Sequence, residues 1–308
     1  MCGVVGFVGQ TKYPEICLKE MVNAINHRGP DNTGIWVDSN IGLGHARLSI
    51  IDLSSAGHQP MHSVSSNFVM IFNGEIYNHN EIRMELNSLH ERKWTGHSDT
   101  ETLLEAIEQW GLETTLNKTK GMFSIALWDK RNRNLYLSRD RMGEKPLYYG
   151  WVDNQFVFAS ELKAIKKFPK FNNSIDRNAL ALFLRFNSIP SPYSIYEDIF
   201  KLEPGTIIQF NADSKKIVKS TYWSTEEEII KSSSSAFSGN FEDAVNQLEL
   251  ILSKAVSSQM ESDVPLGAFL SGGVDSSLIV ALMQSQSGQK VNTFSIGFNN
   301  LDFNEAEH

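Results

Sequence analysis

A cysteine stands second in the chain, which begins with the residues MCGVVGFVG. Loss of the initiator methionine would leave Cys2 with a free α-amine beside its thiol. An α-amine has an ordinary pKa of about 7.7–8.0, so near neutral pH it can accept the proton of a nucleophile, as N-terminal amines do in known enzymes. Cys2 is therefore a candidate nucleophile that carries its own base. The alternative is a small core residue at the start of a strand.

Three further polar groups have types and positions that fit the same chemistry. Asn73 and Gly74 end an apolar stretch, and an Asn amide with a Gly backbone N–H can form an oxyanion hole, or merely a hairpin turn. Arg47, in a predicted strand, offers a planar fork for a carboxylate, or is simply exposed. Asp99 begins a helix and can receive an ammonium, or only favour the helix dipole. With the thiol, this set fits a substrate with an α-carboxylate, an α-ammonium and a reactive acyl carbon, such as glutamine.

A glycine-containing loop, FLSGGVDSS, lies towards the other end of the chain. It follows a short apolar run and opens a helical pattern, which is the arrangement of an anion site at a helix N-terminus. The Lys-Ser/Thr pair of a Walker A loop is absent. A carboxylate beside a polyphosphate needs a divalent cation between them, which makes Asp275 the candidate Mg²⁺ ligand. The candidate pyrophosphate residues are Ser271, Gly272, Gly273, Asp275 and Ser276. The alternative is a Gly-Gly turn with Asp275 as a helix cap.

Two regions of different pattern must position these groups. Residues 1–210 combine predicted strands at 2–9, 34–37, 41–51, 67–73 and within 122–160 with a helix that opens at Pro14 and another over 98–111. The second helix has a predicted capping box formed by Ser98 and Glu101. Several antiparallel strands with helices outside them predict an α+β domain.

The rest of the chain predicts a linker and the start of a second domain. Residues 211–240 are the expected linker, with the flexible, Ser-rich stretch at 231–240. Residues 241–308 then alternate between helices and strands in the βαβ pattern of a parallel sheet. Because two parallel strands cannot bury a core on both faces, we expect this α/β domain to be incomplete.

The bulk composition narrows the functional class. The chain has 308 residues, a formal net charge of -8 and two cysteines. The acidic balance argues against nucleic-acid binding and against a membrane surface, and two cysteines cannot build a disulfide framework. The small number of cysteines leads us to expect a protein of the reducing cytoplasm. Apolar runs are too short to span a membrane. Three histidines stand near the motifs, but the sequence shows no pattern that pairs one of them, as a general base, with a residue that would orient it. We therefore interpret His27, His45 and His97 as structural.

The order of the motifs points to one family. The strings MCGVVGF, HRGPD, GHARLSIID, GHQPM, NGEIYN, SDTE, GMFSIALWD, RDRMGEKPLYY, ASELKAI and LEPG occur in the order seen in glutamine-hydrolysing asparagine synthetases. SGGVDSS stands where that family places its ATP pyrophosphate loop. The chain resembles this family from residue 2 to about residue 298.

The resemblance implies a fold and a set of site residues. It implies a class II glutamine amidotransferase domain with the N-terminal-nucleophile fold, an αββα four-layer sandwich, followed by an ATP-pyrophosphatase domain. Cys2 would be the nucleophile, and Asn73 with Gly74 the oxyanion hole. The residues implied for glutamine binding are Arg47, Leu48, Ser49, Ile50, Ile51, Asn73, Gly74, Glu75 and Asp99. The residues implied for ATP are Leu270, Ser271, Gly272, Gly273, Asp275, Ser276 and Ile296, with Leu270 and Ile296 near the adenosine.

The resemblance also implies substrates, cofactors and assembly. The implied small molecules are glutamine, ATP with Mg²⁺, and aspartate, which the family activates as β-aspartyl-AMP before ammonia arrives through an internal tunnel. A homodimer is a possible assembly. Because the later strands of the synthetase domain are missing, we expect this chain to hydrolyse glutamine without making asparagine.

Three alternatives remain open from the sequence. The acceptor could be a uronic acid of a surface glycan, as in close relatives of the family. The chain could be another class II amidotransferase, such as glucosamine-6-phosphate synthase or the purine-pathway enzyme, although these lack SGGVDSS. It could also be a non-catalytic or regulatory remnant.

Overall fold

The chain forms two compact units in a computed structural model that describes residues 1–298 and 304. The first unit is Met1–Glu228 and the second is Ile229–His308. The first unit contains two six-stranded sheets, and the second contains one pair of strands.

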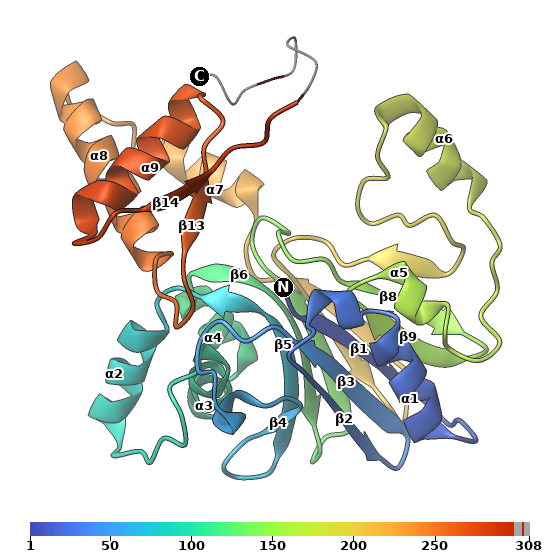
Figure 1. Ribbon diagram of the computed structural model, residues 1–308. Helices are drawn as coiled ribbons and strands as arrows, with labels where there is room; N and C mark the ends of the chain where they lie inside the picture. The colour runs from blue at the N-terminus through green and yellow to red at the C-terminus, as the bar shows by residue number, and fades with distance from the viewer. Residues whose placement is uncertain (299–303, 305–308) are drawn as a thin grey trace. The chain divides into compact units, whose positions relative to one another are not determined.

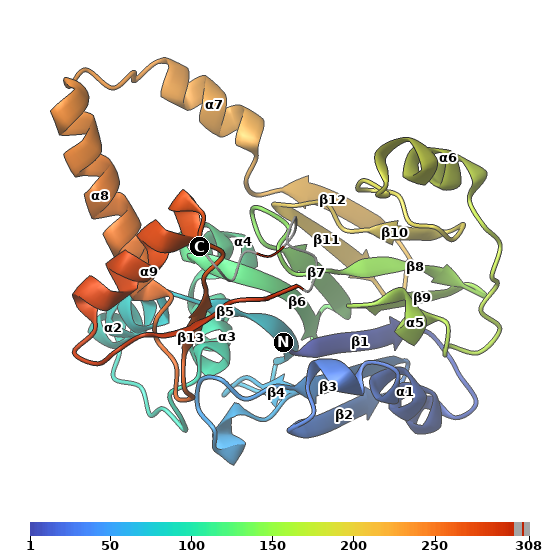
Figure 2. The ribbon, with the colours of Figure 1, turned by 45° about the horizontal axis from the view of Figure 1, so that its top comes forward.

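The two sheets of the first unit are both antiparallel. One has the order β10-β8-β9-β1-β3-β2 and the other β12-β11-β7-β6-β5-β4. The strands of the first sheet are β1 (Gly3–Val8), β2 (Asn32–Asp38), β3 (Ile41–Arg47), β8 (Tyr148–Val152), β9 (Gln155–Ala159) and β10 (Ile199–Lys201). The strands of the second are β4 (Met61–His62), β5 (Phe68–Ile76), β6 (Gly121–Asp129), β7 (Asn134–Arg139), β11 (Thr206–Asn211) and β12 (Ile217–Thr221). Figure 2 shows β1 inside its sheet, between β9 and β3.

The sheets pack face to face around an apolar core. Val4 and Leu43 of the first sheet join Ile71 and Trp128 of the second in one buried cluster. The rings of Phe156 and Phe210, one from each sheet, stack at a centroid distance of 4.4 Å. Every residue of β1 is buried, which explains why this strand reads as a continuous apolar run and does not alternate.

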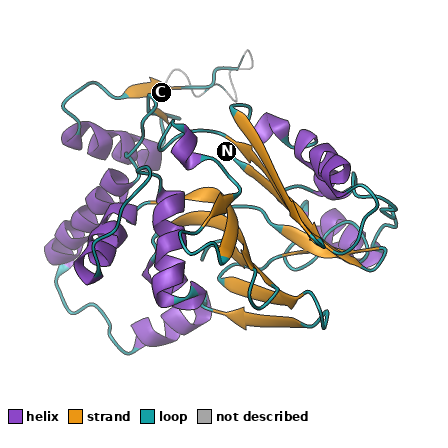
Figure 3. Ribbon diagram, turned by 90° about the horizontal axis from the view of Figure 1, so that it is seen from below, coloured by secondary structure: helices purple, strands orange, loops and turns teal. Residues whose placement is uncertain are grey.

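Helices cover the outer face of each sheet and complete an αββα sandwich (Figure 1). The first sheet packs against α1 (Pro14–Asn23) and α5 (Leu162–Ile165). The second packs against α2 (His79–Leu89), α3 (Asp99–Trp110) and α4 (Leu112–Lys118). Figure 3 shows strands between helices in this unit. The remaining helical elements are α6 (Arg177–Phe186) and the 3₁₀ turns Asn26–Arg28 and Ser55–Gly57. The predicted four-layer class is confirmed.

The local signals that mark helix ends are largely as expected. Pro14 opens α1 at its first turn, where a missing N–H costs nothing. Ser98 caps α3 by accepting a hydrogen bond from the Glu101 N–H at 3.2 Å. The other half of the predicted capping box differs, because the Glu101 carboxylate accepts from the N–H groups of Thr95 and Gly96 instead.

Two boundaries differ from the sequence prediction. The strand expected over 41–51 ends at Arg47, and residues 48–51 leave the sheet as a loop. Within the stretch expected as a linker, β12 pairs with β11, and a helix, α7 (Thr225–Ser233), extends into the Ser-rich run. The sheet therefore continues beyond the domain end predicted at residue 210.

The second unit contains a strand–helix–strand arrangement after a long helix. Its elements are α8 (Phe241–Ser258), β13 (Gly267–Phe269), α9 (Val274–Gln286) and β14 (Asn292–Phe294). β13 and β14 are parallel, as the pattern predicted. A small core of Val256, Leu282 and Met283 joins the two helices. Within residues 1–298 and 304, no helix has the length and apolar character needed to cross a membrane.

Candidate active site

One cleft in the first unit brings together most of the residues predicted for glutamine. Its lining includes Cys2, Arg47, Leu48, Ile50, Ile51, Asn73, Gly74, Glu75 and Asp99. These residues come from the start of β1, the loop after β3, the end of β5 and the first turn of α3. Ser49 is outside the lining, and its N–H donates to a carboxylate oxygen of Asp31 at 2.8 Å.

The Cys2 thiol lies against the loop that follows β3. The Leu48 N–H donates to Sγ at 3.3 Å, and Sγ lies 3.4 Å from the Leu48 carbonyl oxygen. The Cys2 carbonyl accepts a hydrogen bond from Arg28 Nε at 2.8 Å. Burial raises the pKa of the Cys2 thiol, although the Leu48 hydrogen bond acts against this rise. The sulfur is therefore a thiol near neutral pH and needs a base before it can attack.

The amino end of the chain lies in the same cleft. Met1 and Lys145 both line it, and Lys145 Nζ donates to the sulfur of Met1. Burial lowers the pKa of the Met1 α-amine, and the charges of Arg28 and Lys145 act in the same direction. This shift favours the uncharged amine, which is the form that can accept a proton.

Asn73 has an unusual hydrogen-bonding state. Its side chain is 1% exposed and lines the cleft, yet neither Nδ2 nor Oδ1 has a hydrogen-bond partner among the residues that the structure describes. Buried polar groups are normally paired, and leaving one unpaired costs about 1–3 kcal/mol. An amide held in this state inside a cleft is positioned for a ligand that supplies the missing partner.

The loop after β3 holds the Arg47 guanidinium in place. Arg47 is 7% exposed and donates to the carbonyl oxygens of Ser54, at 2.9 Å, and Asp52. Asp52 has a left-handed φ of +57°, and its carboxylate accepts from the Ser54 N–H and hydroxyl and from the His97 N–H. Gly57 packs directly on the guanidinium, where a Cβ would lie 2.1 Å from Nη2. Two of the five guanidinium N–H groups are thus used, and three are left for a carboxylate.

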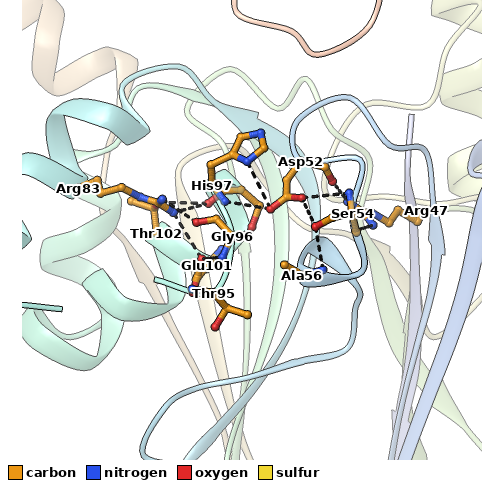
Figure 4. A network of polar contacts seen from close by, with 11 residues as sticks. Arg47, Asp52, Ser54, Ala56, Arg83, Thr95, Gly96, His97, Glu101 and Thr102 are labelled. Atoms are coloured by element: carbon orange, nitrogen blue, oxygen red, sulfur yellow. Dashed lines mark hydrogen bonds and ion pairs between the residues drawn. The ribbon is translucent and has the colours of Figure 1, made fainter. Parts of the chain in front are cut away.

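A polar network joins this loop to the start of α3. Figure 4 shows Asp52 between Arg47 and His97, with Arg83 on the other side of the 95–97 segment. Arg83 donates to the Gly96 carbonyl oxygen at 2.9 Å and lies 3.5 Å from the Glu101 carboxylate. Burial would raise the pKa of Asp52, but hydrogen bonds from Ser54 and His97 outweigh it and lower that pKa. Asp52 is therefore an anion that fixes two walls of the cleft.

Two carboxyl groups, those of Asp99 and Glu75, also line the cleft. Asp99 is 6% exposed and accepts from the Ile76 N–H at 3.0 Å. Burial raises the pKa of Asp99 to about 6, against the hydrogen bonds from Ile76 and Thr100. Burial also raises the pKa of Glu75, which Lys145 opposes. A buried carboxylate that is costly to ionise gains most from a cationic ligand, so this wall suits an ammonium.

Some residues of the cleft were not predicted from the sequence. Gln59 is buried, accepts from the Phe72 N–H at 2.6 Å and donates to the Thr100 hydroxyl at 3.3 Å. Gln59 and Lys145 both stand in quoted motifs, GHQPM and RDRMGEKPLYY, but no local pattern shows that these polar side chains are buried. The other unpredicted lining residues are Met1, Gly57, Phe72, Ser98 and Thr100.

The three histidines lie outside the lining. His45 is fully buried, its Nε2 lies 3.0 Å from the Phe72 carbonyl oxygen, and burial lowers its pKa to about 3. His27 contacts Glu161, and His97 contacts Asp52.

The second unit contains the candidate nucleotide loop. It joins β13 to α9, with Gly273 as the N-cap and Gly272 at a φ of +74°, a conformation that favours glycine. Ser271 and Ser276 meet through their hydroxyls at 3.1 Å. Leu270 N–H donates to the Phe294 carbonyl at 2.9 Å, which ties the loop to β14.

The remaining predicted ATP residues lie on either side of this loop. Asp275 is exposed in the first turn of α9, and Ile296 is exposed after β14. The open loop at a helix N-terminus fits an anion. Among residues 1–298 and 304, no group of three or more His, Cys, Asp or Glu side chains is placed to hold a metal ion.

Comparison with known protein families matches both units. Residues 1–223 match the model of the glutamine amidotransferase domain, and residues 247–308 match that of asparagine synthase. A Methanocaldococcus jannaschii protein, provisionally named glutamine-hydrolysing asparagine synthetase 2, is 37% identical; the alignment covers 97% of this chain and 60% of the relative. Glutamine-hydrolysing asparagine synthetase 1 of Bacillus subtilis is 36% identical over 100% of this chain and 47% of its own length. The chain thus spans about half the length of the curated relatives it matches.

Solved structures support the fold. A glutamine phosphoribosylpyrophosphate amidotransferase from Bacillus subtilis aligns with a TM-score of 0.56 at 16% identity, covering 98% of this chain and 68% of that one. A structure described as the allosteric regulatory enzyme of purine biosynthesis aligns with a TM-score of 0.57 at 17% identity, covering 97% and 66%. These likenesses concern the fold alone. The family model that covers residues 1–223 shows the family, and the chain belongs to the glutamine amidotransferase domain family.

Proposed function

We propose that this chain hydrolyses glutamine to glutamate and ammonia, with Cys2 as the nucleophile after Met1 has been removed. In this proposal the Cys2 α-amine takes the thiol proton, and Sγ attacks the amide carbon of glutamine. The oxyanion of the tetrahedral intermediate accepts hydrogen bonds from the Asn73 amide and the Gly74 N–H. The α-ammonium returns its proton to the leaving nitrogen, which departs as ammonia, and water then hydrolyses the thioester to give glutamate.

The walls of the cleft supply the specificity of the proposed reaction. Arg47, framed by its loop, would bind the α-carboxylate, with the backbone of Leu48 to Ile51 beside it. Asp99 and Glu75 would bind the α-ammonium. A positive group at one end and two carboxyls at the other match a free amino acid, and the amide carbon then lies towards Cys2 and Asn73.

The unpartnered amide of Asn73 is the single observation that carries this proposal. A turn residue would be exposed or paired, whereas Asn73 is buried, unpaired and in one cleft with the Cys2 sulfur. An amide that can donate to a developing charge and has no other partner is preorganised for that charge.

For the whole protein we propose glutamine-dependent asparagine synthesis in the cytoplasm. Ser271, Gly272, Gly273 and Ser276 would hold the ATP pyrophosphate, with Asp275 as a Mg²⁺ ligand and Leu270 and Ile296 near the adenosine. ATP would activate the aspartate carboxyl group for attack by ammonia. The family match to asparagine synthase and the open β13–α9 loop support this part. A homodimer is the assembly that we propose for the chain.

The test of the glutaminase is a mass and product measurement on the chain itself. Intact-mass analysis is expected to show the loss of Met1, and incubation with glutamine should release glutamate and ammonia in equal amounts. A chain that has lost Met1 and releases neither product overturns the proposal. Binding of Mg²⁺-ATP, and its weakening in Asp275→Asn, tests the second unit separately.

A further inference from the structure

A buried lysine lies beside the amino end of the chain, and its ammonium has no strong hydrogen-bond acceptor among the residues that the structure describes. Lys145 is 3% exposed, lines the same cleft as Cys2, and donates to the thioether sulfur of Met1, which is a weak acceptor. Burying a lysine costs free energy unless its charge serves an interaction. Removal of Met1 would take that sulfur away and leave the ammonium in the cleft that also contains the new amino end of the chain, at Cys2.

The turn that carries Lys145 is held firmly. The Asp140 carboxylate accepts from the N–H groups of Glu144 and Lys145, at 2.8 and 2.9 Å. The Arg139 guanidinium donates to the carbonyl oxygens of Lys145 and Leu202, at 2.7 and 2.6 Å. The turn is thus held by contacts to its backbone, and the Lys145 side chain that it carries is buried in the lining of the cleft.

From this geometry we propose that Lys145 is a positioning residue that keeps the α-amine of the processed Cys2 in its uncharged, proton-accepting form. The inference rests on the proposed glutaminase reaction. A fixed positive charge disfavours a second one nearby, so the amine holds its proton less tightly than it would without Lys145.

Lys145 does not act on the terminal amine alone. Arg28 lowers the pKa of this amine as well and is the larger of the two charge effects, while it also forms an ion pair with Glu161 at 2.9 Å. Glu75 acts in the opposite direction and favours the protonated amine. The charge of Asp99 raises the pKa of the Cys2 thiol, and that of Arg47 lowers it. The charges that act on Lys145 are those of Arg28 and of three carboxylates, Glu75, Glu144 and Asp140. Burial lowers the pKa of Lys145, and these carboxylates oppose that change and support its charge.

The test is the pH profile of kcat/KM for glutamine, measured on the Met1-free chain. Lys145→Met is expected to move the acidic limb of the profile to higher pH by about one unit, because the amine then stays protonated to higher pH. Lys145→Arg keeps the charge and is expected to restore the wild-type limb. Lys170→Met is the matched control, since Lys170 is exposed and pairs with Asp153 away from the cleft.

Each outcome decides one point. An acidic limb unchanged in Lys145→Met, with the wild-type chain active, overturns the role of Lys145 and leaves the glutaminase standing. A wild-type chain that does not hydrolyse glutamine overturns the proposed function itself. If Lys145→Met does not fold, as judged by its circular dichroism, Lys145→Gln is measured by the same criterion. The rate at which a glutamine-analogue electrophile labels Cys2, measured as a function of pH, should show the same acidic limb without requiring turnover.

Discussion

The guanidinium of Arg47 donates a hydrogen bond to the backbone carbonyl of Asp52, while the Asp52 carboxylate accepts from the His97 N–H at 2.9 Å. Asp52 thereby links the wall that would bind a carboxylate to the segment that leads into Asp99. Two segments of the cleft wall are thus tied together by a residue that is 1% exposed and is not itself part of the lining.

This link predicts a defect in binding when Asp52 is changed. Asp52→Ala is expected to raise KM for glutamine about 10-fold or more, with a smaller fall in kcat, because positioning is lost while Cys2 and Asn73 remain. Steady-state kinetics on the purified variant measure both constants. Asp38→Ala, at an exposed strand end, is the control, and a loss confined to kcat would contradict the prediction.

The two cysteines are expected to differ sharply in reactivity. Cys2→Ala should abolish glutamine hydrolysis and keep the fold, because the side chain contributes no core packing of its own. Burial raises the pKa of Cys17 to about 11, so that thiol should stay unreactive. Peptide mass analysis after treatment with a glutamine-analogue electrophile should find the label on Cys2 only. Label on Cys17, or none, would favour the non-catalytic interpretation.

Loss of the Asn73 amide should slow turnover without harming the fold. Asn73→Ala is expected to lower kcat about 10²–10³-fold, the usual cost of one oxyanion donor. The melting temperature should not fall, since the variant removes a buried polar group that lacks a partner. Ser138→Ala, another buried and unpartnered polar group outside the cleft, is the control. Turnover within twofold of the wild type would make Asn73 a structural residue only.

Asp99 should lower stability near neutral pH in the absence of substrate. Its pKa is about 6 in the fold against 3.8 for the free carboxyl, so between these values the folded state holds a proton that the unfolded state has lost. The free energy of unfolding is therefore highest, as far as this group is concerned, below pH 4, and it falls as the pH rises to about 6. Asp99→Asn should raise the melting temperature at pH 7 and leave it unchanged below pH 4, while glutamine binding is lost.

Thermal melts at both pH values measure this effect, with a gain of about 1–3 kcal/mol expected at pH 7. Asp38→Asn serves as the exposed carboxyl control. A variant that melts below the wild type at pH 7 would show that the Asp99 carboxylate is paired well enough to stabilise the free protein.

Local sequence signals predicted α1, α3 and β1, because each depends on neighbours along the chain. Pro14 and Ser98 mark helix starts, and the apolar run of β1 reflects a strand covered on both faces. The end of β3 at Arg47 was not predictable in the same way. It depends on Asp52, whose left-handed backbone is held by contacts with His97, 45 residues away.

The burial of Gln59 and Lys145 likewise depends on contacts between residues that are far apart in the sequence. Gln59 is enclosed because its amide bridges Phe72 on β5 and Thr100 on α3, and Lys145 because its turn folds back onto the first residues of the chain. Such groups become visible only when the sheets and helices are assembled. The residue types at Cys2, Arg47, Asn73 and Asp99 indicated the chemistry, and the assembled fold brings them into one cleft.

The placement of Cys2 has a practical consequence for handling this protein. Since Cys2 leads directly into β1 and Met1 lines the cleft, a purification tag fused ahead of Cys2 would keep its α-amine in a peptide bond and remove the proposed base. Recombinant samples should therefore carry their tag at the carboxyl end. Their quality is best judged by the fraction of molecules in which Cys2 is the first residue.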